Sequence, residues 1–277
     1  MVFPFTGSSA TTNGTGASTN AQVNLPSGIQ ANDLLLIIHR TAVAGAHTYS
    51  GSGWTELKDG SPDASDDNMS LAWKKADGTE GAFWNITQGS GKFATIALRI
   101  TGSADPTIQP PEASTDATGD STTPDPLALT GSGGSKDYLW LWMGGWEGEQ
   151  TSPPAGAPTN YSGSLGANSG TGGLPTTNVR VAYAQRSLTA ASEDPPSWTI
   201  SVTDSWTAWT VIIHPVPPPP ITKTHTIDIL LKATQTKTHT TDIFLQSPSV
   251  SKTHTADILL LQTQSKTYTS DLLLQAT

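Results

Sequence analysis

Four short repeats near the C-terminal end hold most of the residues that could do chemistry. Each follows the pattern Lys-Thr-His-Thr-x-Asp, with Tyr in place of His in the last, and the lysines lie 14, 15 and 14 residues apart. The recurring residues are Lys223, His225, Asp228, Lys237, His239, Asp242, Lys252, His254, Asp257, Lys266, Tyr268 and Asp271. Stacked histidines would form an imidazole ladder able to bind a metal. Tyr268 conserves a ring but not this ligand, so we expect ring stacking or hydrogen bonding and predict neither a metal site nor a cofactor.

A second candidate site is aromatic. Trp140, Trp142 and Trp146 share one face of a predicted strand by their even spacing. Exposed rings in this arrangement could bind a host surface glycan by stacking, whereas buried rings would belong to the core. Leu139 and Leu141 make the opposite face apolar too, which favours burial on both sides.

An enzymatic site is not indicated. Glu147 and Glu149 could supply the two carboxylates of a glycosidase. Their spacing places both on one side of a strand, whereas glycosidase carboxylates flank the scissile bond from opposite sides. The chain also lacks a Gly-x-Ser-x-Gly elbow and a phosphate-binding loop. We therefore predict no catalytic residue and no enzyme activity.

Residues 1–215 have the pattern of an all-β domain. Short apolar runs, several of them alternating, are separated by Gly, Pro, Asn and Asp, and no helical period is present. The predicted strands are 33–44, 54–58, 69–75, 82–87, 92–101, 127–130, 138–146, 179–188, 198–202 and 208–214. This number of strands predicts an antiparallel β-sandwich of the jelly-roll kind.

Three polar segments interrupt this pattern. Residues 6–20 are nearly all Thr, Ser, Gly, Asn and Ala, which predicts a flexible arm or a loop that orders against a partner. Residues 103–123 and 151–177 are expected to be long surface loops. Such loops serve recognition, contact a neighbouring subunit or are simply solvated, and we favour the last two interpretations.

A polyproline linker, 216–220, separates this domain from the repeats at 221–277. The repeats favour strands with turns at 233–235, 247–249 and 262–264, although Thr-x-Asp could also cap a short helical turn. A repeat of this length cannot bury its own apolar residues. The tail should therefore oligomerise or anchor the protein, and we expect a homotrimer.

Composition narrows the classes of partner. The chain has no cysteine, and residues 1–215 carry the acidic excess behind the net charge of −9. Without a basic cluster we expect no nucleic-acid partner. No apolar run is long enough to cross a bilayer and no signal-peptide pattern is present, so we expect no membrane association and no export by the usual signal route.

Several stretches resemble known sequences. They are Leu25-Pro-Ser-Gly-Ile-Gln-Ala-Asn-Asp-Leu-Leu-Leu, Gly53-Trp-Thr-Glu-Leu, Ala72-Trp-Lys-Lys-Ala-Asp-Gly-Thr-Glu and Ala97-Leu-Arg-Ile-Thr-Gly. They are similar to β-sandwich domains in virion proteins of tailed bacteriophages, and the Lys-Thr-His-Thr-x-Asp repeats resemble tandem arrays at the ends of phage fibre and minor structural proteins.

This resemblance implies a virion structural protein, a surface fibre or capsid decoration that is assembled in the host cytoplasm and is extracellular in the mature particle. Its partners would be copies of itself and other virion proteins, such as the major capsid or tail proteins. The alternatives are a carbohydrate-binding adhesin or receptor-binding module for host attachment, a self-polymerising extracellular filament and a glycan hydrolase.

Overall fold

The computed structural model describes residues 2–51, 53–60, 67–148, 156–170 and 178–218, and four short strands between 225 and 275. The chain divides into two compact units, Met1–Pro217 and Pro218–Thr277, called the head and the tail below. This division falls inside the predicted linker 216–220. The described residues form strands and turns without a helix, and both large sheets of the head are antiparallel. The predicted all-β class with antiparallel sheets is confirmed.

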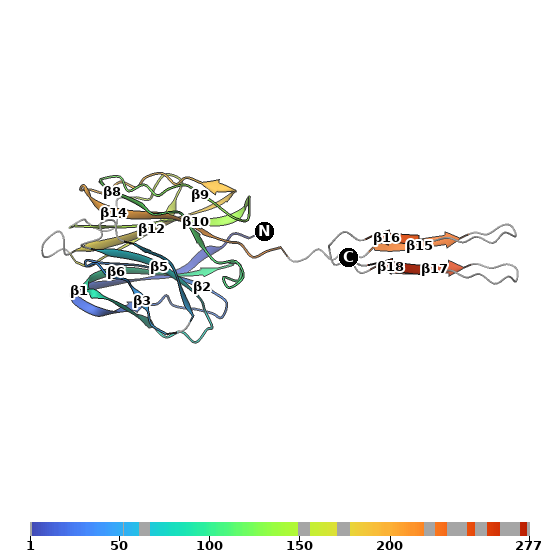
Figure 1. Ribbon diagram of the computed structural model, residues 1–277, viewed down its shortest axis with the longest axis horizontal. Helices are drawn as coiled ribbons and strands as arrows, with labels where there is room; N and C mark the ends of the chain where they lie inside the picture. Colours follow the sequence, from blue (N-terminus) through green and yellow to red (C-terminus); the bar gives the residue numbers. More distant parts are fainter. Residues whose placement is uncertain are drawn as a thin grey trace. The chain divides into compact units, whose positions relative to one another are not determined.

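The first sheet of the head has the strand order β1-β6-β2-β5-β4, and β3 also pairs with β6. Figure 1 labels β1, β2, β3, β5 and β6 of this sheet. Its strands are β1 (Phe5–Asn24), β2 (Leu34–Thr41), β3 (Thr48–Tyr49), β4 (Trp54–Gly60), β5 (Asn68–Lys75) and β6 (Phe83–Thr101). Every residue of β2 is buried, because this strand lies between β5 and β6 and both of its faces are covered. Its continuous apolar sequence is typical of such a central position.

The second sheet has the order β11-β12-β10-β14-β7, and β8 also pairs with β14. Its strands are β7 (Glu112–Ala113), β8 (Ala117–Ser121), β10 (Lys136–Glu147), β11 (Ser162–Asn168), β12 (Val179–Ala190) and β14 (Asp204–Ile213). A separate pair is formed by β9 (Leu129–Thr130) and β13 (Ser192–Glu193). The long β10 runs between β12 and β14, so this sheet also has a buried centre.

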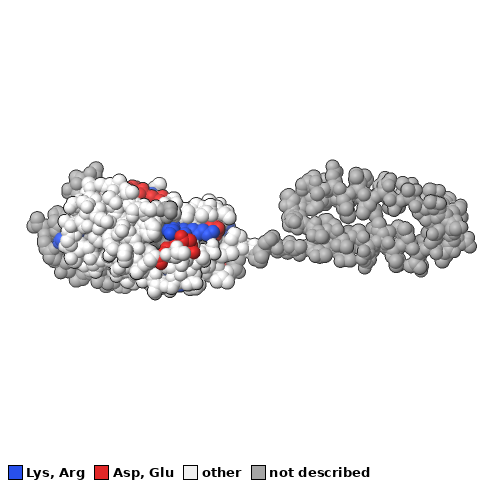
Figure 2. All heavy atoms as spheres, turned by 90° about the horizontal axis from the view of Figure 1, so that it is seen from below, with Lys and Arg blue, Asp and Glu red and all other residues white. Residues whose placement is uncertain are grey.

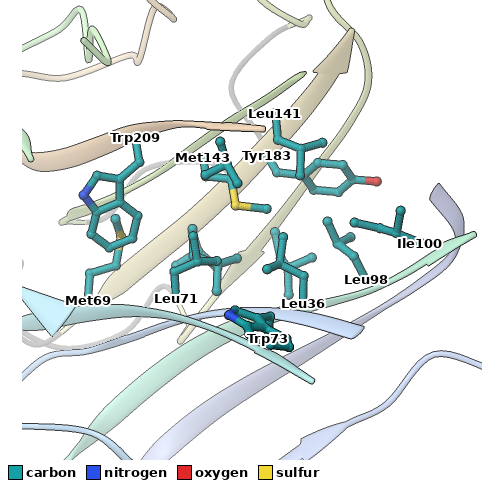
Figure 3. Close-up of a cluster of buried hydrophobic side chains, with 14 of the residues drawn as sticks. Leu36, Met69, Leu71, Trp73, Leu98, Ile100, Leu141, Met143, Tyr183 and Trp209 are labelled. Carbon is teal, nitrogen blue, oxygen red and sulfur yellow. The ribbon is translucent and has the colours of Figure 1, made fainter. Parts of the chain in front are cut away.

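The two sheets share one hydrophobic core. Figure 3 shows Leu36, Leu71 and Leu98 of the first sheet pointing toward side chains of the second sheet. The labelled partners from the second sheet are Leu141, Met143, Tyr183 and Trp209. Strand alternation explains which residues of each strand belong to this core, since only every second residue can face it.

The structure corrects the prediction of a flexible arm at 6–20. These residues belong to β1, which pairs with β6 along most of its length. The polar sequence is tolerated because β1 lies at the edge of its sheet, where backbone pairing and a few contacts specify the strand. A Cβ at Gly14 would lie 2.2 Å from the Phe93 ring, so this glycine gives the ring its space.

Other strand boundaries differ from the prediction. Residues 82–87 and 92–101 form the single strand β6, in which Gly89 and Gly91 allow Val43 to pack directly on the backbone. Residues 198–202 are not a strand, although Trp198 N and Ile200 N donate to the carbonyls of Pro124 and Thr122. The predicted loop 103–123 contains β7 and β8, and the predicted loop 151–177 contains β11.

The tail has four described strands, one in each repeat. They are β15 (His225–Leu231), β16 (Ile243–Gln246), β17 (His254–Leu260) and β18 (Leu272–Gln275). β15 pairs with β17 and β16 pairs with β18, both in parallel. The described segments are therefore extended and are not capped helical turns, whereas the predicted turns 233–235, 247–249 and 262–264 lie outside the described residues.

Candidate functional site

The tail brings recurring residues of the repeats into register. His225 pairs with His254, and Asp228 pairs with Asp257. Neighbouring strands lie about 4.8 Å apart, so residues of one type form rows across the paired strands. The other predicted residues of the repeats, Lys223, Lys237, His239, Asp242, Lys252, Lys266, Tyr268 and Asp271, lie outside the described residues.

The pairing follows a period of two repeats. The first repeat pairs with the third and the second with the fourth, so 29 positions separate the partners in both sheets, from 225 to 254 and from 243 to 272. The seven residues of β15 and β17 differ only where Ile227 meets Ala256. The chain thus contains two successive copies of one two-repeat unit, paired side by side.

The three tryptophans considered as a possible glycan-binding site are buried. Trp140, Trp142 and Trp146 are at most 1% exposed. Trp198 packs edge-on against Trp142, with the ring centroids 4.9 Å apart. Trp140 donates from Nε1 to the Leu188 carbonyl at 3.1 Å. These rings cannot stack on a sugar, so the glycan-binding hypothesis is wrong for these residues and their core interpretation is confirmed.

A different set of aromatic side chains is only half-buried. Tyr49, Trp54 and Trp84, which we call the outer aromatic group, lie on the face of the first sheet that points away from the shared core. The Tyr49 and Trp54 rings are stacked with centroids 5.7 Å apart, and the Trp54 and Trp84 centroids are 5.8 Å apart. Lys74 Nζ lies 5.1 Å from the Trp84 ring centroid, a cation–π contact.

Sequence reasoning missed the outer aromatic group because its members come from β3, β4 and β6 and lie far apart in the chain. The available signal was the pair Gly51 and Gly53 beside Trp54. Both glycines have positive φ angles, and a Cβ at Gly51 would approach Trp84 Cζ2 to 3.2 Å. The glycines therefore allow the loop to pass close to the Trp84 ring.

A buried polar network lies beneath this surface. His39 Nδ1 lies 2.6 Å from Thr95 Oγ1, and its Nε2 lies 2.7 Å from Gln88 Oε1. His47 Nδ1 lies 2.6 Å from Ser70 Oγ. That last distance suits a nucleophile and its base, but Ser70 is 0% exposed and His47 is 3% exposed. With no access for a substrate, these hydrogen bonds serve to satisfy buried polar groups.

Burial also sets the charge of these histidines. It lowers the pKa of His39 to about 4, against a smaller opposing effect of the Gln88 hydrogen bond. Burial and the neighbouring His39 together lower the pKa of His47 to about 2. Both imidazoles are therefore neutral near pH 7 and act as hydrogen-bonding groups.

The acidic residues considered for catalysis do not form a described pair. Glu149 lies outside the described residues, and Glu147 is half-buried near Asp204. Burial, with a further contribution from Glu147, raises the pKa of Asp204 to about 6. Nearby, Arg40 forms an ion pair with Asp67 and donates from Nη1 to the Gly145 carbonyl at 2.8 Å. Arg40 thereby joins the first sheet to the second.

A cavity of about 340 Å³ lies beside the C-terminal end of β14. It is lined by Ile108, Gln109, Pro110, Glu112, Ser132 and His214. His214 Nε2 lies 2.6 Å from Glu112 Oε1, and Ser132 Oγ donates to the same carboxylate at 2.7 Å. Burial lowers the pKa of His214 and the Glu112 carboxylate opposes this. The carboxylate lies between the other two groups, so the histidine is not placed to activate the serine.

Charge on the described surface is sparse. Figure 2 shows one side of the head, where uncharged residues cover most of the visible surface and charged side chains gather in small groups. Several lysines and arginines pair with carboxylates, including Lys58 with Asp116 and Lys75 with Asp105. Within the described ranges, no group of three or more His, Cys, Asp or Glu could hold a metal ion, and no helix is long and apolar enough to cross a membrane.

No protein family model, curated protein or solved structure matches the chain. The geometry of the head and tail therefore carries the functional argument.

Proposed function

We propose that this chain is a non-enzymatic structural protein that assembles through its C-terminal repeats and exposes its head. A surface fibre or capsid decoration of a virion is the setting in which we place it. The observation that carries the proposal is the parallel, in-register pairing of the repeats. A two-stranded sheet is marginal by itself, and further strands of the same sequence would stabilise it.

The organisation of the head supports the same role. We propose that its two sheets form a β-sandwich of the jelly-roll kind, with their shared core providing stability without disulfides. Separate aromatic clusters cover the outer face of the second sheet, including Trp142, Trp146 and Trp206. A head stabilised in this way suits a particle that is assembled inside a cell and later exposed outside it.

Deletion of residues 221–277 tests this proposal. We expect the shortened protein to keep the near-UV circular dichroism of a folded head but to lose oligomerisation, as measured by light scattering, and incorporation into particles. A folded head that still forms the full-length oligomer and still enters particles would refute assembly through the repeats.

A glycan-binding module is the second candidate, and the outer aromatic group is the observation that favours it. Half-buried Trp54 and Trp84 can offer ring surface to a sugar, and the buried ion pair of Lys74 with Glu80 holds Lys74 beside the Trp84 ring. We expect glycan-array binding to be lost in Trp54→Ala and Trp84→Ala and retained in Phe83→Ala. Phe83 is 50% exposed and does not belong to the group, which makes it a matched control. Equal binding by all three variants would remove this candidate.

A further inference from the structure

The tail presents strand edges that match one another. Among its described strands, each has a single neighbour, so β15 and β17 pair along one edge and leave the other without a described partner. The same holds for β16 and β18. Unpaired backbone groups along such an edge can accept a further strand.

The sequence of that further strand follows from the pairing within the chain. β15 and β17 share His-Thr, Asp and Ile-Leu-Leu at registered positions. The side of β17 that faces away from β15 is therefore suited to another strand like β15. A second copy of the chain offers the same strand in its own β15.

We propose that the tails of two copies pair edge to edge, with β17 and β18 of one copy continuing the sheets of β15 and β16 of the next. This inference deepens the proposed assembly role and rests on it. Parallel strands have a direction, so the contact joins two different surfaces of the tail and is heterologous. It differs from a three-fold bundle, in which the same positions of all copies meet around an axis.

The size of the head limits such a stack. Each copy adds two strands to a sheet, or about 10 Å. A domain of the head's length has a radius of gyration of about 17 Å. Successive heads would therefore have to spread around the stack, and an extended polyproline linker would give a reach of about 3 Å per residue. We expect stacks of few copies.

Cysteine crosslinking can test whether β17 of one copy lies beside β15 of the next, because the chain has no cysteine of its own. Thr226 and Thr255 are registered partners, so Thr226→Cys and Thr255→Cys place one thiol on each matching edge. The two full-length variants are co-expressed with different affinity tags and treated with a thiol crosslinker no longer than the strand spacing of about 4.8 Å. We expect crosslinked dimers that carry both tags, and none from either variant alone.

The control for register is Leu259→Cys in place of Thr255→Cys. Leu259 lies four positions, or about 13 Å, farther along β17 than Thr255. This pair should not crosslink. Dimers formed by Thr226→Cys alone would show that equal positions meet and would overturn the stacked arrangement. Oligomers without any crosslink would overturn it as well while leaving the assembly proposal intact, whereas a monomer at all concentrations would overturn both.

Discussion

The imidazoles of His39 and His47 are neutral inside the head, and this has a consequence for acid stability. In the unfolded chain His39 binds a proton near pH 6.5, but in the folded head only near pH 4. Between these values the unfolded state binds more protons, so the free energy of unfolding falls as the pH is lowered from about 6.5 to about 4. Above about pH 6.5 His39 is neutral in both states, so its titration no longer lowers the free energy of unfolding.

We expect His39 to contribute about 3 kcal/mol to this loss of stability. Urea denaturation at several pH values would measure it, with His39→Leu as the comparison because leucine does not titrate. The variant should be less stable at pH 7, since Thr95 and Gln88 lose a partner, but its stability should depend less on pH. An unchanged pH dependence in the variant would contradict the assignment.

Trp142 tests whether the aromatic residues of β10 act in the core. It is 0% exposed and packs against Trp198, so Trp142→Ala should lower the free energy of unfolding by about 3–5 kcal/mol. Ile108→Ala is the control, because this side chain is 83% exposed and its loss should change stability by less than about 0.5 kcal/mol. Similar losses in the two variants, measured by chemical denaturation, would argue against the core role.

At the scale of elements, β1 shows that partner contacts can specify a strand whose own sequence is polar. Gly14 and Gly16 both lie in this strand. A Cβ at Gly14 would overlap the Phe93 ring, whereas a Cβ at Gly16 would meet nothing within 4 Å. The two positions separate steric fit from any general effect of replacing glycine.

We expect Gly14→Ala to destabilise the head by about 1–3 kcal/mol through overpacking, and Gly16→Ala to have little effect. Hydrogen exchange should show weaker protection of β1 in the first variant, and Phe93→Leu in the same chain should restore part of the lost stability. Equal effects of the two alanines would mean that Phe93 does not determine the position of β1.

The sequence predicted the strands that carry their own apolar pattern. The Leu-Leu-Leu-Ile-Ile run of β2 and the two apolar faces of β10 are sufficient by themselves to indicate buried strands. In contrast, β1 and β11 are polar or glycine-rich and depend on β6 and β12 for pairing. The split predicted within β6 failed because Gly89 and Gly91 serve close packing against Val43 rather than a turn.

Among the candidate sites too, only the features with a local sequence pattern could be predicted. Repetition alone predicted that the tail repeats stack, but it did not show which repeats pair. Burial of Trp140, Trp142 and Trp146 could be favoured from their apolar neighbours. The outer aromatic group could not be found in this way, because the contact of Trp54 with Trp84 depends on where the loop before β4 crosses the sheet.

At the scale of the whole molecule, head and tail are separate units that can be followed independently. All nine tryptophans lie at or before Trp209, so their fluorescence reports on the head alone. We expect deletion of residues 221–277 to leave the denaturation midpoint of this signal unchanged at low protein concentration, because the hydrophobic clusters described for the head are built from its own strands and loops. A large fall in the midpoint would mean that the tail stabilises the head.

The junction between these units also determines how the head responds to force. Beyond Ile213 the chain is tied to the end of β6, since Ser103 pairs with Pro215 and Val216 N donates to the Gly102 carbonyl at 3.4 Å. β1 also pairs with the end of β6, where Phe5 lies opposite Thr101. Tension on residue 217 first peels this short attachment. We expect the load to reach β14 only after that, and β14 is held to β10 by eight registered pairs.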